Sequence, residues 1–178
     1  MIPPSPIRAA VAALVALLVT PAFAAASSPP TASPSKSKLG KSAELWATID
    51  VCNPTDQPDM LGIRGSMPGD GQAGVAMYMN FRMQFLNSAT KRWVNLPAGG
   101  ASSGFVYIGS AKSARQAGFS FQLVPEPGQT FKLRGVVNFQ WRRGTTIVES
   151  LSRSTAAGHK SLAGADPANF SAATCSIS

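Results

Sequence analysis

Ser102 and His159 are the residues whose types could support hydrolysis. Residues 100–104 read Gly-Ala-Ser-Ser-Gly, which matches the G-x-S-x-G turn that presents a serine nucleophile in some hydrolases. That turn requires a strand before it and a helix after it, whereas Ser102 follows Pro-Ala-Gly-Gly and precedes no helical pattern. His159 is the chain's only histidine and follows Ala-Ala-Gly. We therefore expect both residues to lie in loops, and we expect no enzyme activity.

Methionine sulfur is a candidate ligand for copper in exported proteins. The candidates are Met60, Met67, Met77, Met79 and Met83. Met77, Met79 and Met83 alternate with polar residues and share one strand face with Phe81 and Phe85, as core residues do. No His-Met pair accompanies them, so we expect core packing and no cofactor.

Oxygen ligands for Ca²⁺ are available on either side of residues 61–67, which we expect to form the second strand of the chain. The candidates are Asn53, Asp56, Asp59 and Asp70, which would meet if the turns before and after that strand lay at one end of a sandwich. The spacing is not that of an EF-hand, and Asn and Asp favour turns for their own backbone reasons. We therefore expect these residues to form turns and to bind no metal.

Cys52 and Cys175 are the only cysteines of the chain. An even pair in an exported protein indicates one disulfide, and no C-x-x-C spacing or adjacent histidine supports a reactive thiol. The bond would close a loop of more than about 120 residues, worth about 4 to 5 kcal/mol on the chain-entropy model. We predict that it ties together the two ends of the folded domain.

Charge is distributed unevenly along the chain. Residues 43–81 carry a net charge of −4, whereas residues 82–154 carry +8. The candidate basic binding face consists of Arg82, Lys132, Arg134, Arg142 and Arg143. Such a stripe suits acidic glycans, teichoic acids, phospholipid headgroups or extracellular DNA, although no aromatic nucleotide-stacking motif accompanies it and nucleic acid is disfavoured. The alternative is a solvated face that binds nothing.

Aromatic side chains suggest a different ligand class. Trp46, Trp93, Tyr78 and Tyr107 would stack on sugar rings if they were exposed, which would make the protein a carbohydrate-binding module. Burial of all the tryptophans would remove the main physical basis of this alternative.

Short alternating segments must position these residues. Residues 76–86 place Met77, Met79, Phe81, Met83 and Phe85 on one face, and residues 130–142 place large apolar and basic residues on opposite faces. Seven to nine such segments recur between turns rich in Gly and Pro, without helical periodicity. This pattern predicts an all-β, antiparallel two-sheet sandwich with one wet face on its central strands.

Two segments carry a resemblance at the level of the fold. MYMNFRMQF and FKLRGVVNFQWRRGTTIVESLSRS resemble central strands of the immunoglobulin-like and fibronectin type III-like domains of secreted bacterial proteins, over Ala43 to Ser178. The resemblance implies an interaction or structural module. The Cys-Trp-Cys pattern of immunoglobulin domains is absent, so strand order stays open and a jelly roll is the alternative.

The N-terminal residues indicate export. Residues 1–24 contain Arg8, an apolar run of about 11 residues and an A-x-A ending, which predicts a cleaved secretory signal because a membrane-spanning helix needs about 20. Residues 25–42 are rich in Ser, Pro and Lys and are expected to be a linker without core residues. We thus expect residues 43–178 to form a secreted, non-catalytic β-sandwich domain, extracellular or at the cell envelope. Its partners would be anionic cell-envelope polymers, glycans or another protein.

Overall fold

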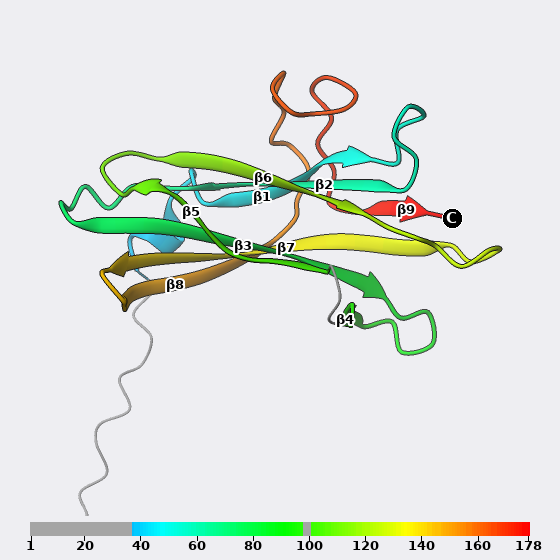
Figure 1. The fold of residues 1–178 in the computed structure, drawn as a ribbon, viewed down its shortest axis with the longest axis horizontal. Helices are drawn as coiled ribbons and strands as arrows, with labels where there is room; N and C mark the ends of the chain where they lie inside the picture. Colours follow the sequence, from blue (N-terminus) through cyan, green and yellow to red (C-terminus); the bar gives the residue numbers. More distant parts are fainter. Residues whose placement is uncertain (1–36, 98–100) are drawn as a thin grey trace, which may run out of the picture. The chain divides into compact units, whose positions relative to one another are not determined.

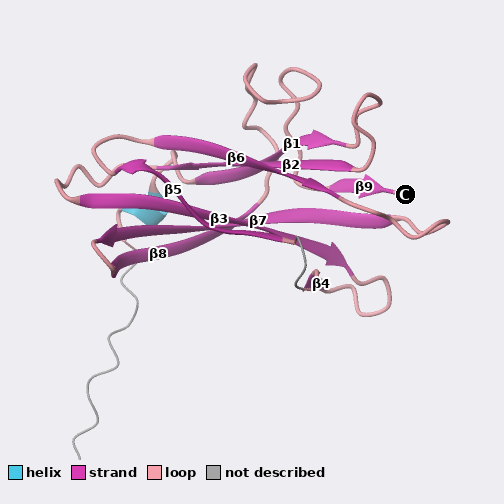
Figure 2. Cartoon of the chain, in the orientation of Figure 1, coloured by secondary structure: helices cyan, strands magenta, loops and turns pink. Residues whose placement is uncertain are grey.

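Nine β-strands form two antiparallel sheets in the computed structural model, which describes residues 37–97 and 101–178. The strands are β1 (Trp46–Cys52), β2 (Met60–Met67), β3 (Val75–Leu86), β4 (Trp93–Asn95), β5 (Ser102–Ser110), β6 (Arg115–Gln122), β7 (Phe131–Arg143), β8 (Thr146–Ser154) and β9 (Cys175–Ile177). The smaller sheet has the order β1-β2-β6, and the larger has β4-β3-β7-β8 with β5 also paired to β3 and β9 to β7. Figures 1 and 2 show the sheets as two layers. The predicted all-β, antiparallel two-sheet sandwich is confirmed.

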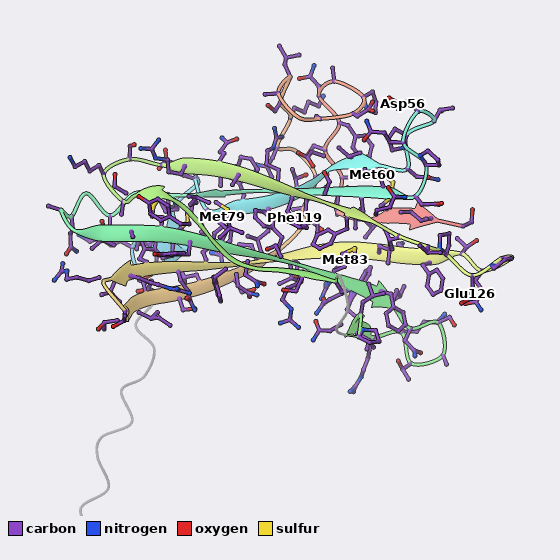
Figure 3. All side chains as sticks on the ribbon, in the orientation of Figure 1. Asp56, Met60, Met79, Met83, Phe119 and Glu126 are labelled. Carbon is purple, nitrogen blue, oxygen red and sulfur yellow. A yellow bond between two sulfur atoms is a disulfide. The ribbon has the colours of Figure 1, made fainter. Side chains whose placement is uncertain are left out.

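The core lies between the two layers. Apolar and polar residues alternate along β3 and β7, and the pairing register places the apolar residues of the two strands side by side on one face. Met79 pairs with Phe139, and Phe81 pairs with Val137, so large apolar side chains meet across neighbouring strands. All four are buried, and Met79 lies between the two layers in Figure 3. The inward face predicted from the alternation is therefore confirmed. The methionines of this face are core residues, as expected.

The Cys52–Cys175 disulfide predicted from the sequence is present. Cys52 ends β1 of the smaller sheet, and Cys175 begins β9 of the larger sheet. The bond therefore joins the two layers as well as the two ends of the folded chain.

The connection from β8 to β9 covers the free edge of β1. Ala172 pairs with Ile49, and the Asp166 backbone N–H donates a hydrogen bond to the carbonyl of Asp50 over 2.8 Å. In Figure 1 this orange connection rises beyond the layer that contains β1 and β2. An edge strand is thus paired rather than left open.

The folded unit begins earlier than the composition suggested. Residues Leu39–Lys41 form a short 3-10 helix, Leu39 packs against the core, and the carbonyl of Gly40 accepts a hydrogen bond from Arg153. The expectation that residues 25–42 contribute no core residue is wrong at Leu39. The predicted export signal, residues 1–24, lies outside the described residues. None of the helices in the described ranges is long and apolar enough to cross a membrane.

Candidate functional site

The outward side of the larger sheet collects cationic and aromatic side chains. We define the basic sheet face as Tyr78, Asn80, Arg82 and Gln84 of β3, Trp93 of β4, Ser102, Phe105 and Tyr107 of β5, and Lys132, Arg134, Asn138, Gln140 and Arg142 of β7. Alternation directs these residues away from the core. Strands β3, β4, β5 and β7 contain no Asp or Glu, so nothing on them neutralises the cations.

Arg142 is held over two aromatic rings. Its guanidinium carbon lies 4.2 Å from the ring centroid of Tyr78 and 4.9 Å from that of Phe105. Its Nε donates a hydrogen bond of 2.9 Å to Oε1 of Gln140. These contacts fix the orientation of the guanidinium group in advance of any ligand.

Arg134 repeats the arrangement toward the other end of the face. Its guanidinium carbon lies 4.5 Å from the ring centroid of Trp93, and its Nε donates to Oε1 of Gln84 over 2.8 Å. Gln84 in turn donates to Oδ1 of Asn95 over 3.0 Å. Partial burial lowers the pKa of Arg134 from its ordinary value, yet an arginine in such a place stays cationic at neutral pH.

Ser102 belongs to this face and has no histidine beside it. It begins β5, so the expected loop position is wrong, and its Oγ accepts a hydrogen bond of 3.1 Å from Asn80. His159 lies in the β8–β9 connection, where its ring stacks on Trp46 with 4.4 Å between centroids. Burial and the charge of Arg64 lower the pKa of His159. The structure does not bring Ser102 and His159 together as a nucleophile and base.

Four of the five predicted cations share the basic sheet face, and Arg143 does not. Neighbouring residues of a strand point to opposite sides, so Arg143 cannot face the same way as Arg142. Its guanidinium instead donates a hydrogen bond of 2.7 Å to Oε1 of Gln72 in the β2–β3 connection. The prediction that Arg143 belongs to the stripe is therefore corrected.

The aromatic residues differ in what they leave exposed. Trp141 is fully buried and donates its indole N–H to the carbonyl of Pro68 over 3.1 Å. Trp93 lies under Arg134, whereas Tyr107 is 60% exposed. Sequence reasoning missed Phe105, which lies two residues before Tyr107 and therefore on the same side of β5. The pairing of arginines with rings depends on strand neighbours that local patterns do not specify.

The candidate calcium ligands do not converge. Asp59 precedes β2 and Asp70 follows it, so the length of the strand separates them. Asn53 accepts a hydrogen bond from the backbone of Asp59, and Asp70 accepts one from the backbone of Gln72, as turn residues do. Within the described ranges, no three His, Cys, Asp or Glu residues are grouped as metal ligands would be.

The fold and the face together define a two-sheet antiparallel β-sandwich that presents an arginine-rich, aromatic surface. No protein-family model, no curated protein and no solved structure matches this chain.

Proposed function

We propose that the chain is an exported, non-catalytic interaction module that binds an anionic polysaccharide through the basic sheet face. The observation that supports this most is the acid-free face on which Arg134 and Arg142 are each stacked over an aromatic ring. The antiparallel two-sheet arrangement, with a disulfide between the layers, supports an immunoglobulin-like module.

Stacked arginines are suited to carboxylate and sulfate groups. Guanidinium groups present planar pairs of N–H donors that match such groups, and the rings under them reduce the conformational entropy lost on binding. A polysaccharide with repeated anionic groups would meet several of these cations at once.

The spacing favours a polymer over a single sugar. Arg142 pairs with Ala76 and Arg134 with Gln84, so their backbones are eight residues apart along β3, about 27 Å at about 3.4 Å per residue. Arg82 lies between these levels. An extended anionic chain can bridge this distance, which one monosaccharide cannot.

A carbohydrate-binding module for neutral glycans is the second candidate. Tyr107, 60% exposed and 5.6 Å from Tyr78 between ring centroids, favours it. Trp93 and Tyr78 have arginines over their rings, which leaves less aromatic surface for a sugar.

Retention on immobilised polygalacturonate, with amylose resin as the neutral comparison, tests the proposal. We expect the protein to bind polygalacturonate at low salt and to elute as salt rises, because the Debye length over which charges interact falls to about 3 Å at about 1 M salt. Arg134→Glu with Arg142→Glu should abolish retention. Lys112→Glu with Lys160→Glu makes the same charge change at two exposed positions elsewhere and should retain most of it. Equal retention of both double variants would refute the proposal. Salt-independent binding to amylose that Tyr107→Ala removes would favour the second candidate.

A further inference from the structure

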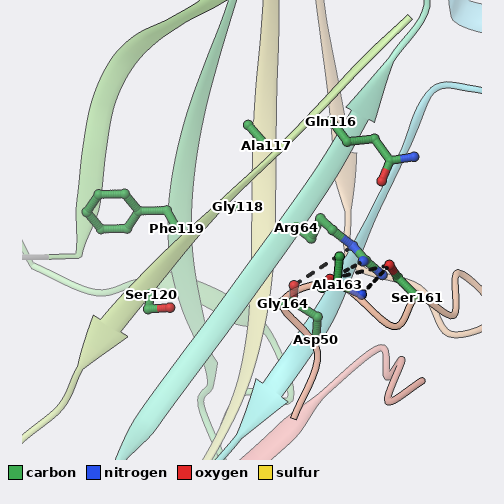
Figure 4. Close-up of a pocket in the computed structure, with 10 residues that line it drawn as sticks. All are labelled: Asp50, Arg64, Gln116, Ala117, Gly118, Phe119, Ser120, Ser161, Ala163 and Gly164. Atoms are coloured by element: carbon green, nitrogen blue, oxygen red, sulfur yellow. Dashed lines mark hydrogen bonds and ion pairs between the residues drawn. The ribbon is translucent and has the colours of Figure 1, made fainter. Parts of the chain in front are cut away.

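A separate cavity lies against the outward side of the smaller sheet, under the β8–β9 connection. It has a volume of about 410 Å³, within the range of small-molecule sites. Its lining consists of Asp50, Arg64, residues 116–120, Ser161, Ala163 and Gly164 (Figure 4). No residue of the basic sheet face takes part in it.

Arg64 is fixed in this cavity by the connection above it. Its two terminal nitrogens donate hydrogen bonds to the carbonyls of Ala163, over 3.1 Å, and His159, over 2.7 Å. The residue is 6% exposed, and its buried Nε has no hydrogen-bond partner in the described part of the chain. A buried charged donor without a partner is costly, so the hydrogen-bonding capacity of Arg64 in this cavity is incompletely satisfied.

Asp50 offers the complementary acceptor. Its Oδ2 lies 3.8 Å from Nε of Arg64, too far for a hydrogen bond, and the residue is 5% exposed. Its carboxylate accepts no hydrogen bond from another residue in the described ranges. Burial raises the pKa of Asp50, opposed by the charge of Arg64 and by its own backbone N–H.

We propose that this cavity binds a neutral sugar ring through its hydroxyl groups. The two charges compensate each other, so the pair gives the cavity little net attraction for either an anion or a cation. Each terminal nitrogen of Arg64 carries two N–H groups and makes one hydrogen bond, so a second N–H remains on each. A hydroxyl group both accepts and donates, so it can accept from such an N–H and donate to the carboxylate of Asp50. Ser120, Ser161 and Gln116 add neutral polar groups to the lining. The site is independent of the anionic-polysaccharide proposal because it lies on the other sheet.

Gly118 keeps one wall of the cavity open. It lies on β6 in ordinary extended backbone, and a Cβ built there would meet only the carbonyl oxygen of Ile63, at 3.5 Å. The strand therefore tolerates a side chain at this position, and that side chain would occupy space left for the ring. Gln122, an exposed residue on the same side of β6, lies outside the lining and provides a matched control position.

Backbone amide NMR of the oxidised protein, titrated separately with D-glucose, D-galactose and D-mannose, tests the proposal. We expect at least one hexose to shift the amides of residues 116–120 and 161–164 in a saturable way. Gly118→Val should weaken that binding about tenfold or more, equivalent to about 1.4 kcal/mol, whereas Gln122→Val should not. If Gly118→Val does not fold, Gly118→Ala, whose methyl group makes an ordinary contact, must weaken binding at the same amides.

Charged probes and the other face complete the experiment. Inorganic phosphate should not shift these amides, and Arg134→Glu with Arg142→Glu should leave hexose binding unchanged. The proposal is overturned if no hexose shifts the amides of residues 116–120 at millimolar concentration, or if phosphate binds there instead. Arg134→Glu with Arg142→Glu should lose retention on polygalacturonate and keep hexose binding, and this outcome would support two independent sites.

Discussion

The guanidinium carbon of Arg142 lies 4.2 Å from the ring centroid of Tyr78, although the two residues are not direct partners across β7 and β3. Arg142 pairs with Ala76, so its side chain leans along the sheet by two residues to reach the ring. The small side chain of Ala76 leaves the ring of Tyr78 as the nearest large surface on β3. The ring of Tyr78, together with Phe105 and Gln140, therefore fixes where this cation is presented.

Tyr78→Leu should therefore weaken retention on polygalacturonate while the fold persists. A cation–π contact at an exposed site is worth about 0.5–1 kcal/mol, which corresponds to about two- to fivefold in affinity. Tyr78→Phe keeps the ring and should bind like the parent. The salt concentration at elution measures the effect, and an equal loss in both variants would show that the hydroxyl group matters instead of the ring.

Loss of the Cys52–Cys175 disulfide should lower the free energy of unfolding by about 4 to 5 kcal/mol, given the separation of 123 residues that it closes. Cys52→Ala with Cys175→Ala, compared with the oxidised parent by urea unfolding, measures this loss. Mass spectrometry without reductant should find the parent two hydrogens lighter than its reduced form. A change below about 1 kcal/mol would mean that the unfolded chain gains little freedom from losing the bond.

Phe139→Ala should cost about 3 to 5 kcal/mol of unfolding free energy, because Phe139 is fully buried beside Met79. Ile147 on β8 is 50% exposed, and Ile147→Ala should cost distinctly less. Urea denaturation of both variants makes the comparison. Equal costs would contradict the assignment of the β7 face that packs in the core.

Local sequence patterns predict which side of a strand is buried, but they do not predict which strands lie next to one another in the sheet. The alternation in residues 76–86 and 130–142 predicted which side of β3 and β7 is buried, because a period of two depends only on the strand itself. The basic stripe predicted from residue type includes Arg143, whereas alternation along β7 assigns Arg143 to the side opposite Arg142. The predicted export signal lies outside the described residues.

The cavity could not be predicted because it depends on contacts between distant segments. Asp50, Arg64 and Ala163 come from β1, β2 and the β8–β9 connection, and no spacing in the sequence relates them. A single acid in the first predicted strand and a single base in the second were the only local indication. Both are unusual in segments that pack at a core, and buried charges need partners.

Deletion of residues 25–42 should lower the melting temperature, whereas deletion of residues 25–36 should not. Leu39 packs against the core, and Gly40 accepts a hydrogen bond from Arg153, so the longer deletion removes both contacts. A loss of about 1 kcal/mol lowers the melting temperature by about 2–8 °C in domains of this size range. Differential scanning calorimetry of the two deletions decides the matter, and equal melting temperatures would show that the short helix adds no stability.

The pH dependence of stability should reveal which effect dominates at Asp50. Burial raises the pKa of its carboxyl group above the ordinary value of 3.8, so the folded state holds this proton at a pH at which the unfolded state has released it. The unfolding free energy contributed by this group should therefore be greatest at low pH and should fall as pH rises from about 3.8 through the raised pKa.

Asp50→Asn isolates that contribution, because the amide preserves the shape of the side chain and does not titrate. We expect the stability of the parent relative to Asp50→Asn to decrease as pH rises from about 3 to about 7, measured by urea unfolding at each pH. Other carboxyl groups titrate equally in both proteins and cancel in the difference. If the relative stability of the parent instead increases with pH, then the attraction of Arg64, 3.8 Å away, outweighs burial and the pKa of Asp50 is lowered in the folded state.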